Sequence, residues 1–316
     1  MRLGVFLLRR LIASVPLLVG VTFLSFLLMV FFGPDMSLVL AGKNPTVEEI
    51  EALRHSLGYD RPLFTRYASY LGDLVRLDLG TSIHGEPVAA ILRRTVPVSV
   101  ELVLPGFLVG NLLGLGVALV AARYRGRWPD RALMGAAVGA MSVSFLIVVI
   151  FAQLVFSSRQ GLNLFPVQGW IVDSIGDYLY YVTVPTLALV FVTVGYNARF
   201  YRAVLVEELS RDYVRTARAY GASPSRVLTA DALRNCAIPI VTRVVFSIPL
   251  VVISGSLVLE QYFGIPGIGE ATHDAIHSGD QPVLNAVVAL TAVAFVLVQT
   301  LADAAYATFD PRVTLR

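Results

Sequence analysis

Charge, lysine and cysteine are all scarce in this sequence of 316 residues. Charged residues make up 15% of the chain, whereas a soluble domain has about a quarter. The one lysine, Lys43, is followed by asparagine, so the chain lacks the Gly-Lys-Ser/Thr turn of a phosphate-binding P-loop. The one cysteine, Cys236, has no partner within the chain. These absences exclude a P-loop ATPase and an intrachain disulfide.

Long apolar runs take the place of the missing charge. Apolar residues make up 56% of the chain, and the mean hydropathy is +0.71. A run of about 20 apolar residues can cross a bilayer as a helix. The runs that qualify are Leu11–Phe32, Val96–Ala122, Ala132–Phe156, Tyr181–Phe200, Ile238–Leu259 and Val283–Ala307. The sequence therefore predicts an all-α polytopic membrane protein with six transmembrane helices in the lipid bilayer.

The placement of arginine predicts the orientation of these spans. With the N-terminus inside, sixteen of the 25 Lys and Arg residues fall in the segments 1–10, 123–131, 199–237 and 308–316. Short cytoplasmic loops are enriched in positive charge, so we expect both termini and the segment before the fifth span in the cytoplasm. The net charge of +3 reflects this topology, and we predict no nucleic-acid partner.

The predicted organisation has three parts. Residues 1–32 hold the N-terminal tail and first span, 33–95 form an extracellular or periplasmic loop, and 96–316 form a core of five spans. In the loop, Thr46 and Glu49 have the spacing of a capping box, and apolar residues follow at helical spacing. We expect amphipathic helices there, either as a docking surface for an extracellular binding protein or as a structural cover.

The polar segment 207–238, between the fourth and fifth spans, has the pattern of two short helices. The first ends at Gly221, which tolerates a left-handed backbone. Ser223 and Pro224 suit the start of the second. Small side chains share one face of the first helix: Val214, Ala217 and Gly221. The segment is either a docking element for a soluble partner or an ordinary solvated loop.

A family resemblance favours the docking element. DYVRTARAYGASPSRVLTADALRN, followed by Pro239, resembles the coupling segment or EAA loop of the membrane subunits of ATP-driven (ABC) importers. Further blocks resemble the B-type permease subunit of dipeptide and oligopeptide importers, in the peptide and nickel class: LRRLIASVPLLVGVTFLSFLL, LGYDRPLFTRYASYLGDLVRLDLGTS, FGIPGIG and FDPR. They follow the family's order and cover nearly the whole chain. The literal Glu-Ala-Ala is absent, because Arg215, Thr216 and Ala217 stand at its positions.

The resemblance implies a function and its partners. The chain would be a non-catalytic permease subunit in the bacterial cytoplasmic (inner) membrane, forming a path for di- or oligopeptides with a second, homologous permease. One or two ABC ATPase subunits would bind ATP and Mg, a periplasmic substrate-binding protein would deliver the peptide, and this chain would hold no cofactor. The residues expected to contact the ATPase are Asp212, Tyr213, Arg215, Thr216, Ala217, Arg218, Gly221, Ala222, Pro224 and Arg226.

Residues inside the spans give further expectations. Gly106, Gly110 and Gly114 form small-xxx-small repeats, which predict close packing against another helix. Candidates for contact with the transported solute are Asn197, Ser254 and Glu260. A carboxylate at the depth of Glu260 is costly unless it is paired or meets water. It therefore binds either the ammonium group of a peptide or a neighbouring part of the protein.

The sequence also contains features of two other functional classes. His273 and His277, at i and i+4, give part of the zinc protease pattern, but Asp274 replaces the required Glu and no third ligand is evident. We predict no metal site and leave the role of these histidines open. The alternative transporter is a self-sufficient secondary transporter of small solutes, which would show internal repeats and ionisable groups at mid-membrane. No repeat is evident, and Arg243 and Asp303 are the main charges inside spans. The substrate, whether dipeptide, oligopeptide, glutathione, haem or nickel, stays open.

Overall fold

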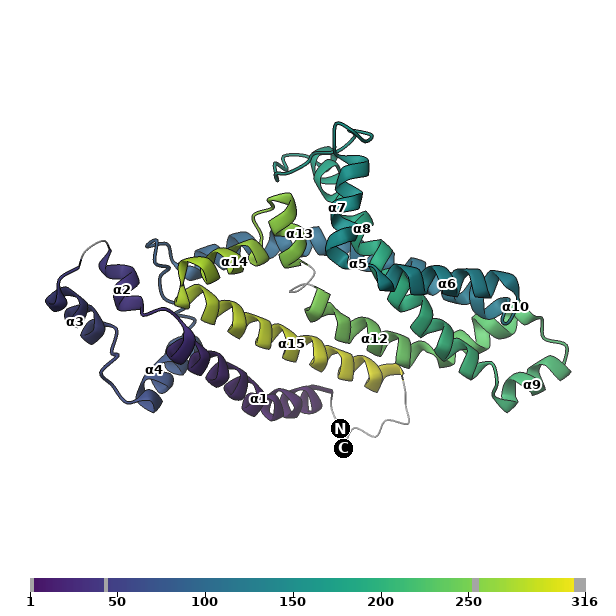
Figure 1. The fold of residues 1–316 in the computed structure, drawn as a ribbon. Coiled ribbons are helices and arrows are strands. Elements are labelled where there is room, and N and C mark those ends of the chain that lie inside the picture. Colours follow the sequence, from purple (N-terminus) through teal and green to yellow (C-terminus); the bar gives the residue numbers. More distant parts are fainter. Residues whose placement is uncertain (1–2, 43–44, 252–255, 310–316) are drawn as a thin grey trace. The chain divides into compact units, whose positions relative to one another are not determined.

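The computed structural model describes residues 3–42, 45–251 and 256–309 (Figure 1). In these ranges the regular structure is helical, with one isolated antiparallel bridge between Thr81 and Pro87. The predicted all-α fold class is therefore confirmed. The described residues fall into two compact units, one within 3–99 and 266–300 and the other within 100–265 and 301–309.

Four of the described helices are long and apolar enough to cross a membrane unbroken: Leu7–Phe32, Val88–Arg123, Ile175–Glu208 and Gln281–Asp303. Two bent pairs pass the same test together: Trp128–Ser142 with Phe145–Phe156, at 99°, and Pro224–Asn235 with Ala237–Pro249, at 57°. If each pair is one span, the total is six, as the sequence predicts. The first bend follows from Val143, whose backbone is extended at φ −90° and ψ 133°.

The fifth span differs in position from its prediction. The apolar run Ile238–Leu259 covers helix α12 (Ala237–Leu250) and the first part of α13 (Ser256–Phe263). Residues 252–255, which include the solute-contact candidate Ser254, lie outside the described residues. The bent pair instead begins at Pro224, inside the polar segment, because helical backbone continues from there almost without interruption to α12.

The first unit is built on two long helices and several short ones. Its elements are α1 (Leu3–Phe32), α2 (Met36–Ala41), α3 (Val47–Ser56), α4 (Leu63–Val75), the first turns of α5 (Val88–Arg123), α14 (Ile268–Ser278) and α15 (Gln281–Phe309) up to residue 300. Its apolar core joins the start of α5 to α14 and α15 through Val88, Leu92, Ala275 and Val283. The capping box is confirmed, since the Glu49 carboxylate accepts from the Thr46 N–H at 2.9 Å and Thr46 Oγ1 accepts from the Glu49 N–H.

Helix α4 packs its aromatic face on α1. The Tyr67 side chain is buried, and its ring meets Phe23 edge-on at a centroid distance of 4.9 Å. Its hydroxyl donates to the Val19 carbonyl at 2.8 Å and lies 2.9 Å from the Thr22 hydroxyl. The apolar and polar contacts of one residue therefore fix α4 against α1.

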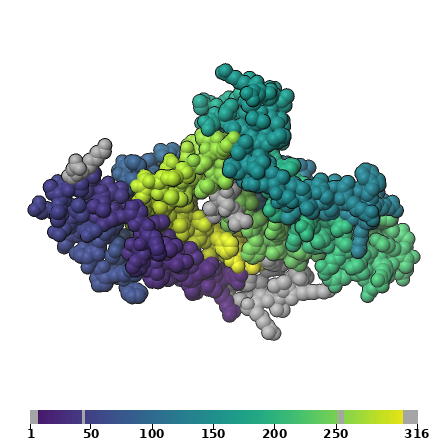
Figure 2. Space-filling model, in the orientation of Figure 1, coloured from purple at the N-terminus to yellow at the C-terminus, as the bar shows by residue number. Residues whose placement is uncertain are grey.

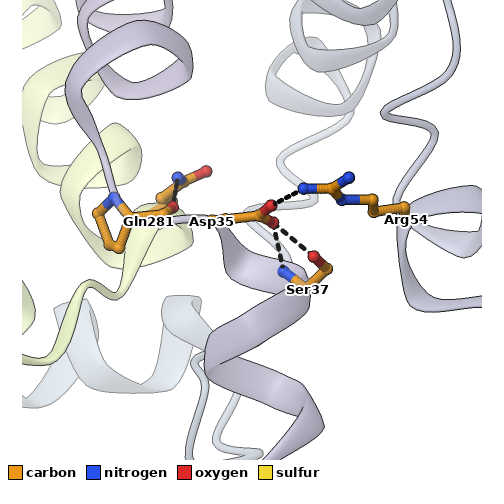
Figure 3. A network of polar contacts seen from close by, with 5 residues as sticks. Asp35, Ser37, Arg54 and Gln281 are labelled. Carbon is orange, nitrogen blue, oxygen red and sulfur yellow. Dashed lines mark hydrogen bonds and ion pairs between the residues drawn. The ribbon is translucent and has the colours of Figure 1, made fainter. Parts of the chain in front are cut away.

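A network of polar side chains organises the chain after α1 (Figure 3). Asp35 caps α2: its Oδ1 accepts from the Ser37 N–H at 3.0 Å, and its Oδ2 accepts from Arg54 of α3 at 2.5 Å. Burial raises the pKa of Asp35, but the hydrogen bonds from Ser37 and Arg54 outweigh it and hold this pKa below its usual value. Gln281, at the start of α15, donates to the Pro34 carbonyl at 2.7 Å. The beginning of the segment is thus tied to α15.

A second polar contact ties the end of the same segment to α15. Asp280 is buried and accepts hydrogen bonds from the Ser82 hydroxyl and, at 3.1 Å, from the Ile83 N–H. Its other oxygen accepts from the Val283 N–H at 3.3 Å, in the first turn of α15. One carboxylate therefore caps α15 and holds the loop before α5.

The second unit contains the rest of α5, α6 (Trp128–Ser142), α7 (Phe145–Phe156), α8 (Ile175–Glu208), α9 (Asp212–Ala219), α10 (Pro224–Arg226), the π-helix η1 (Val227–Ala232), α11 (Leu233–Asn235), α12 and α13. The predicted close packing of the α5 glycines is confirmed, and the partner is α8. A Cβ atom built on Gly106 would lie 2.8 Å from Leu189, and one on Gly110 would lie 2.8 Å from Thr193. Side chains at these positions would separate the two helices.

Candidate functional site

The 207–238 segment forms a folded surface element. Helix α9 ends at Ala219, and Gly221 follows with a left-handed backbone at φ +83°. Ser223 Oγ then accepts from the Arg226 N–H at 3.3 Å and caps α10, with Pro224 at the first helical position. Both predicted helix boundaries are therefore confirmed. No atom lies within 4 Å of a Cβ built on Gly221, so its conformation and not close packing requires glycine here.

The residues of the small-residue face predicted for α9 differ in burial. Val214 is fully buried, and α9 packs on η1, where Val227 and Ala232 are also fully buried. Ala217 is half-buried, whereas Gly221 is exposed. The apolar side of α9 therefore binds the second half of its own segment, and the outward surface is formed by larger side chains.

The outward surface contains most of the predicted ATPase contacts. Exposed residues are Asp212, Tyr213, Arg215, Thr216, Arg218, Gly221, Pro224 and Arg226, while Ala217 and Ala222 are half-buried. Figure 2 shows part of this surface, in green, uncovered on the face in view. Tyr220, which the prediction omitted, is 88% exposed. A large aromatic residue directly before the helix-ending glycine was the available signal in the sequence.

Charge pairs on this surface are weak, because the arginine of each pair is exposed. Arg215 pairs with Asp212 at 3.4 Å, and Arg211 pairs with Glu208 at 3.5 Å. Such pairs contribute about 0–1 kcal/mol, so they leave the arginines able to exchange partners. Partial burial raises the pKa of the Tyr213 hydroxyl.

Beneath the surface, the segment rests on a buried apolar base. Leu228 of η1 and Cys236 pack with Ala118 and Ala122 of α5 and with Tyr201 and Leu205 of α8. Because these side chains are almost fully buried, the segment and the adjoining ends of α5 and α8 form one packed body.

An ion pair fixes α8 to α6 next to this base. Arg202 donates to Asp130 through two nitrogens, with its Nη2 2.6 Å from Oδ2. The same carboxylate accepts from the Gly126 N–H at 2.8 Å, and Asp130 is 3% exposed. A bidentate pair of this kind restricts both position and orientation.

The solute-contact candidates lie in different environments. Asn197 lines a cavity of about 560 Å³ in the second unit, and its amide donates to Asn111 Oδ1 at 2.8 Å. Glu260 is fully buried in α13 and is absent from the described lining of this cavity. Ser254 lies outside the described residues. Of the two described candidates, Asn197 lines this cavity and Glu260 does not.

The histidine pair lies on α14 of the first unit. His273 Nε2 and His277 Nε2 are 3.1 Å apart, and one ring donates a hydrogen bond to the other. Among the described residues, no group of three His, Cys, Asp or Glu side chains could hold a metal ion.

Comparison with known proteins decides the family. The family described as "Binding-protein-dependent transport system inner membrane component" matches residues 110–315, and the N-terminal family of the same membrane components matches residues 3–102. The chain belongs to this family. The membrane component is therefore a multi-pass transport protein, and the 207–238 segment lies within the matched region.

Relatives and a solved structure agree with this assignment. A protein named as a peptide transport system permease from Brucella abortus is 33% identical to the membrane component over 97% of this chain and 98% of its own. The glutathione transport system permease protein GsiC from Shigella flexneri is 32% identical over 98% of both chains. The inward-facing MetNI methionine ABC transporter matches with a TM-score of 0.57 and 17% identity, over 71% of this chain and 99% of that one. This last likeness supports the fold alone.

Proposed function

We propose that this membrane component is the permease subunit of an ATP-driven importer of di- or oligopeptides. The observation that carries the proposal is the exposed surface of α9 and α10 on a packed base, in a chain whose relatives are named as peptide and glutathione permeases. Glutathione is itself a tripeptide, so both names indicate small peptides as the substrate class. The chain completes the path with a second, homologous permease and receives peptide from a periplasmic binding protein.

The 207–238 segment is the proposed contact with the ATPase. The contacting residues are Asp212, Tyr213, Arg215, Thr216, Ala217, Arg218, Gly221, Ala222, Pro224 and Arg226, with Tyr220 added by its exposure. A partner shifts a two-state protein only by binding its two states unequally. Because the segment packs on α5, α8 and α12, a displacement of α9 by the ATPase moves the ends of these helices.

The same proposal assigns ATP binding and solute contact to different subunits. ATP and Mg bind to one or two separate ATPase subunits, and this chain remains non-catalytic and without a cofactor. The protein lies in a bacterial inner membrane with both termini in the cytoplasm, which places the 33–95 segment outside and the 207–238 segment inside. Within the 96–316 core, Asn197, Ser254 and Glu260 remain proposed solute contacts.

Reconstitution tests the proposal against the secondary transporter. The chain is purified in mild detergent together with its neighbours from the native membrane and is placed in liposomes. We expect a second permease and ATPase subunits to accompany it, and peptide uptake to require ATP and the binding protein. Uptake by the isolated chain without ATP would support the secondary transporter instead.

A further inference from the structure

The cavity in the second unit combines a mostly apolar lining with one charged residue. Its walls come from α5, α7, α8 and α12, and most of them are apolar or aromatic: Phe107, Phe145, Leu189, Val192, Thr193, Tyr196, Asn197, Arg243, Phe246, Ser247 and Val251. Arg243 is the one charged residue among these described lining residues. The volume of the cavity is about 560 Å³. This value lies within the range of about 300–1,000 Å³ that is typical of small-ligand sites.

Arg243 lies in α12, which belongs to a candidate membrane span. A guanidinium that faces lipid in a span is costly, so such residues face a water-filled path or a protein partner. Its guanidinium carbon lies 5.6 Å from the centre of the Phe200 ring, a cation–π contact that supports the side chain from one side. Among the described residues, no carboxylate forms an ion pair with it.

The wall of the cavity that α8 forms is held in place by helix packing. Leu189, Thr193 and Asn197 line the cavity from α8, and their side chains lie against Gly106, Gly110 and Gly114 of α5. Asn197 is fixed further by Asn111, which also accepts from the Tyr201 hydroxyl at 2.6 Å. Packing and hydrogen bonds therefore hold the α8 side chains of this cavity in defined positions.

We infer that this cavity is a binding site on the substrate path, in which Arg243 binds the C-terminal carboxylate of the peptide. The inference rests on the proposed function. A guanidinium binds a carboxylate through two parallel hydrogen bonds, and every unmodified peptide has this group whatever its sequence. The aromatic walls formed by Phe107, Tyr196 and Phe246 accept apolar side chains without selecting a particular one. Arg243 thus recognises the carboxylate that all unmodified peptides share, while the aromatic walls accept different apolar side chains.

The test compares two forms of one substrate. The complete transporter with its binding protein is placed in liposomes, and ATP-dependent uptake is measured for an apolar tripeptide with a free C-terminus and for its C-terminal amide. Discrimination by the binding protein is the same for all permease variants, so it cancels when the uptake ratios are compared. The variants are Arg243→Gln, Arg243→Lys and, as a matched control, Arg199→Gln, which removes an exposed arginine of α8 outside the cavity lining.

We expect Arg243→Gln to lower the uptake of the free acid by at least about tenfold, the size of one of its two charge-assisted hydrogen bonds, and to leave uptake of the amide nearly unchanged. Arg243→Lys retains part of the preference, because it keeps the charge but loses the fork of donors. Arg199→Gln retains the wild-type ratio.

Three other results would overturn the inference. An equal loss for both peptides would show that Arg243 supports the fold and not the substrate. Loss of the second permease from purified Arg243→Gln complexes would show that the guanidinium binds a carboxylate of that subunit. A wild-type transporter that takes up neither peptide would contradict the peptide-importer function itself, and the inference with it; the first two results leave that function intact.

Discussion

The two polar segments between spans are held in opposite ways. The 207–238 segment rests on buried apolar side chains such as Val214 and Leu228, and its polar side chains point outward. The 33–95 segment is tied to α1 and α15 by polar contacts, among them those of Tyr67, Asp280 and Gln281. Apolar burial is non-directional, whereas hydrogen bonds fix position. The first arrangement leaves a whole polar surface available to a partner, and the second uses its polar groups internally.

The largest effect is expected at Gly221 in the 207–238 segment. A β-branched side chain in the left-handed region costs on the order of 1–3 kcal/mol, so Gly221→Val should reshape the turn between α9 and α10. We expect ATP-dependent uptake to fall by more than about tenfold, because each 1.4 kcal/mol of lost docking is a factor of ten. Uptake in liposomes and copurification of the ATPase measure this.

Gly85→Val is the matched control for that substitution. Gly85 also has a left-handed backbone, at φ +81°, with no atom within 4 Å of its Cβ position, but it lies in the loop before α5. The control should insert into the membrane and bind the ATPase. Equal loss of ATPase binding in both variants would show that the 207–238 segment has no special part in docking.

The next largest effect is expected at the ion pair between Arg202 and Asp130, which lies beside the apolar base of the 207–238 segment. Arg202→Met leaves the carboxylate of Asp130 almost fully buried with only the Gly126 N–H as a described donor. Breaking a buried pair costs about 3–5 kcal/mol, and the partial exposure of Arg202 places the expected loss near the lower value. Thermal unfolding in detergent measures the change, and Arg215→Met, which breaks the exposed pair with Asp212, should change stability by less than about 1 kcal/mol. The double variant Arg202→Met/Asp130→Leu should regain most of the loss, and failure to do so would assign the effect to packing.

Local signals account for what the sequence predicted correctly. Thr46 with Glu49, Ser223 with Pro224, and Gly221 each define a helix end through contacts within a few residues, so their structure follows from spacing alone. The glycine repeat of α5 predicts close packing but not its partner α8. The cavity depends on Phe107, Asn197 and Arg243, which three separate helices bring together. No short-range pattern contains that information, and Arg243 stood out only as a charge inside a span.

The displaced fifth span has a related cause. The span predicted from the sequence is defined by the length of an apolar run. It therefore starts at Ile238, where the polar residues end. The backbone is helical from Pro224 and bends by 57° before α12, because residues of η1 such as Val227 and Ala232 are buried against their neighbours. Tertiary burial thus extends the helix beyond the limit that composition sets.

A smaller effect is expected in the 33–95 segment from Tyr67→Phe. The substitution keeps the ring contact with Phe23 but removes the hydroxyl that donates to the Val19 carbonyl and meets Thr22. One lost hydrogen bond costs about 0.5–1.5 kcal/mol, and the unsatisfied partner sets the actual value. Hydrogen exchange should rise in α4 and remain unchanged in α9. Tyr220→Phe is the control, because its side chain is 88% exposed, and equal exchange in wild type and Tyr67→Phe would show that ring packing alone holds α4.

The smallest effect is the pH response of the Asp35 network. Burial raises the pKa of this carboxyl, but the hydrogen bonds from Ser37 and Arg54 outweigh burial and hold the pKa below the usual 3.8. A carboxyl whose folded pKa is lowered contributes stability that is present above its unfolded pKa and is lost as the pH falls through the folded pKa. Hydrogen exchange in α2 and α3 should therefore increase as the pH drops from 5 toward values below 3.8, relative to the intrinsic exchange rate at each pH. Arg54→Gln should weaken this dependence, since it removes one of the groups that lower the pKa. The same acidification should leave the apolar base of the 207–238 segment protected; matching responses in both segments would contradict the distinction between apolar and polar anchoring.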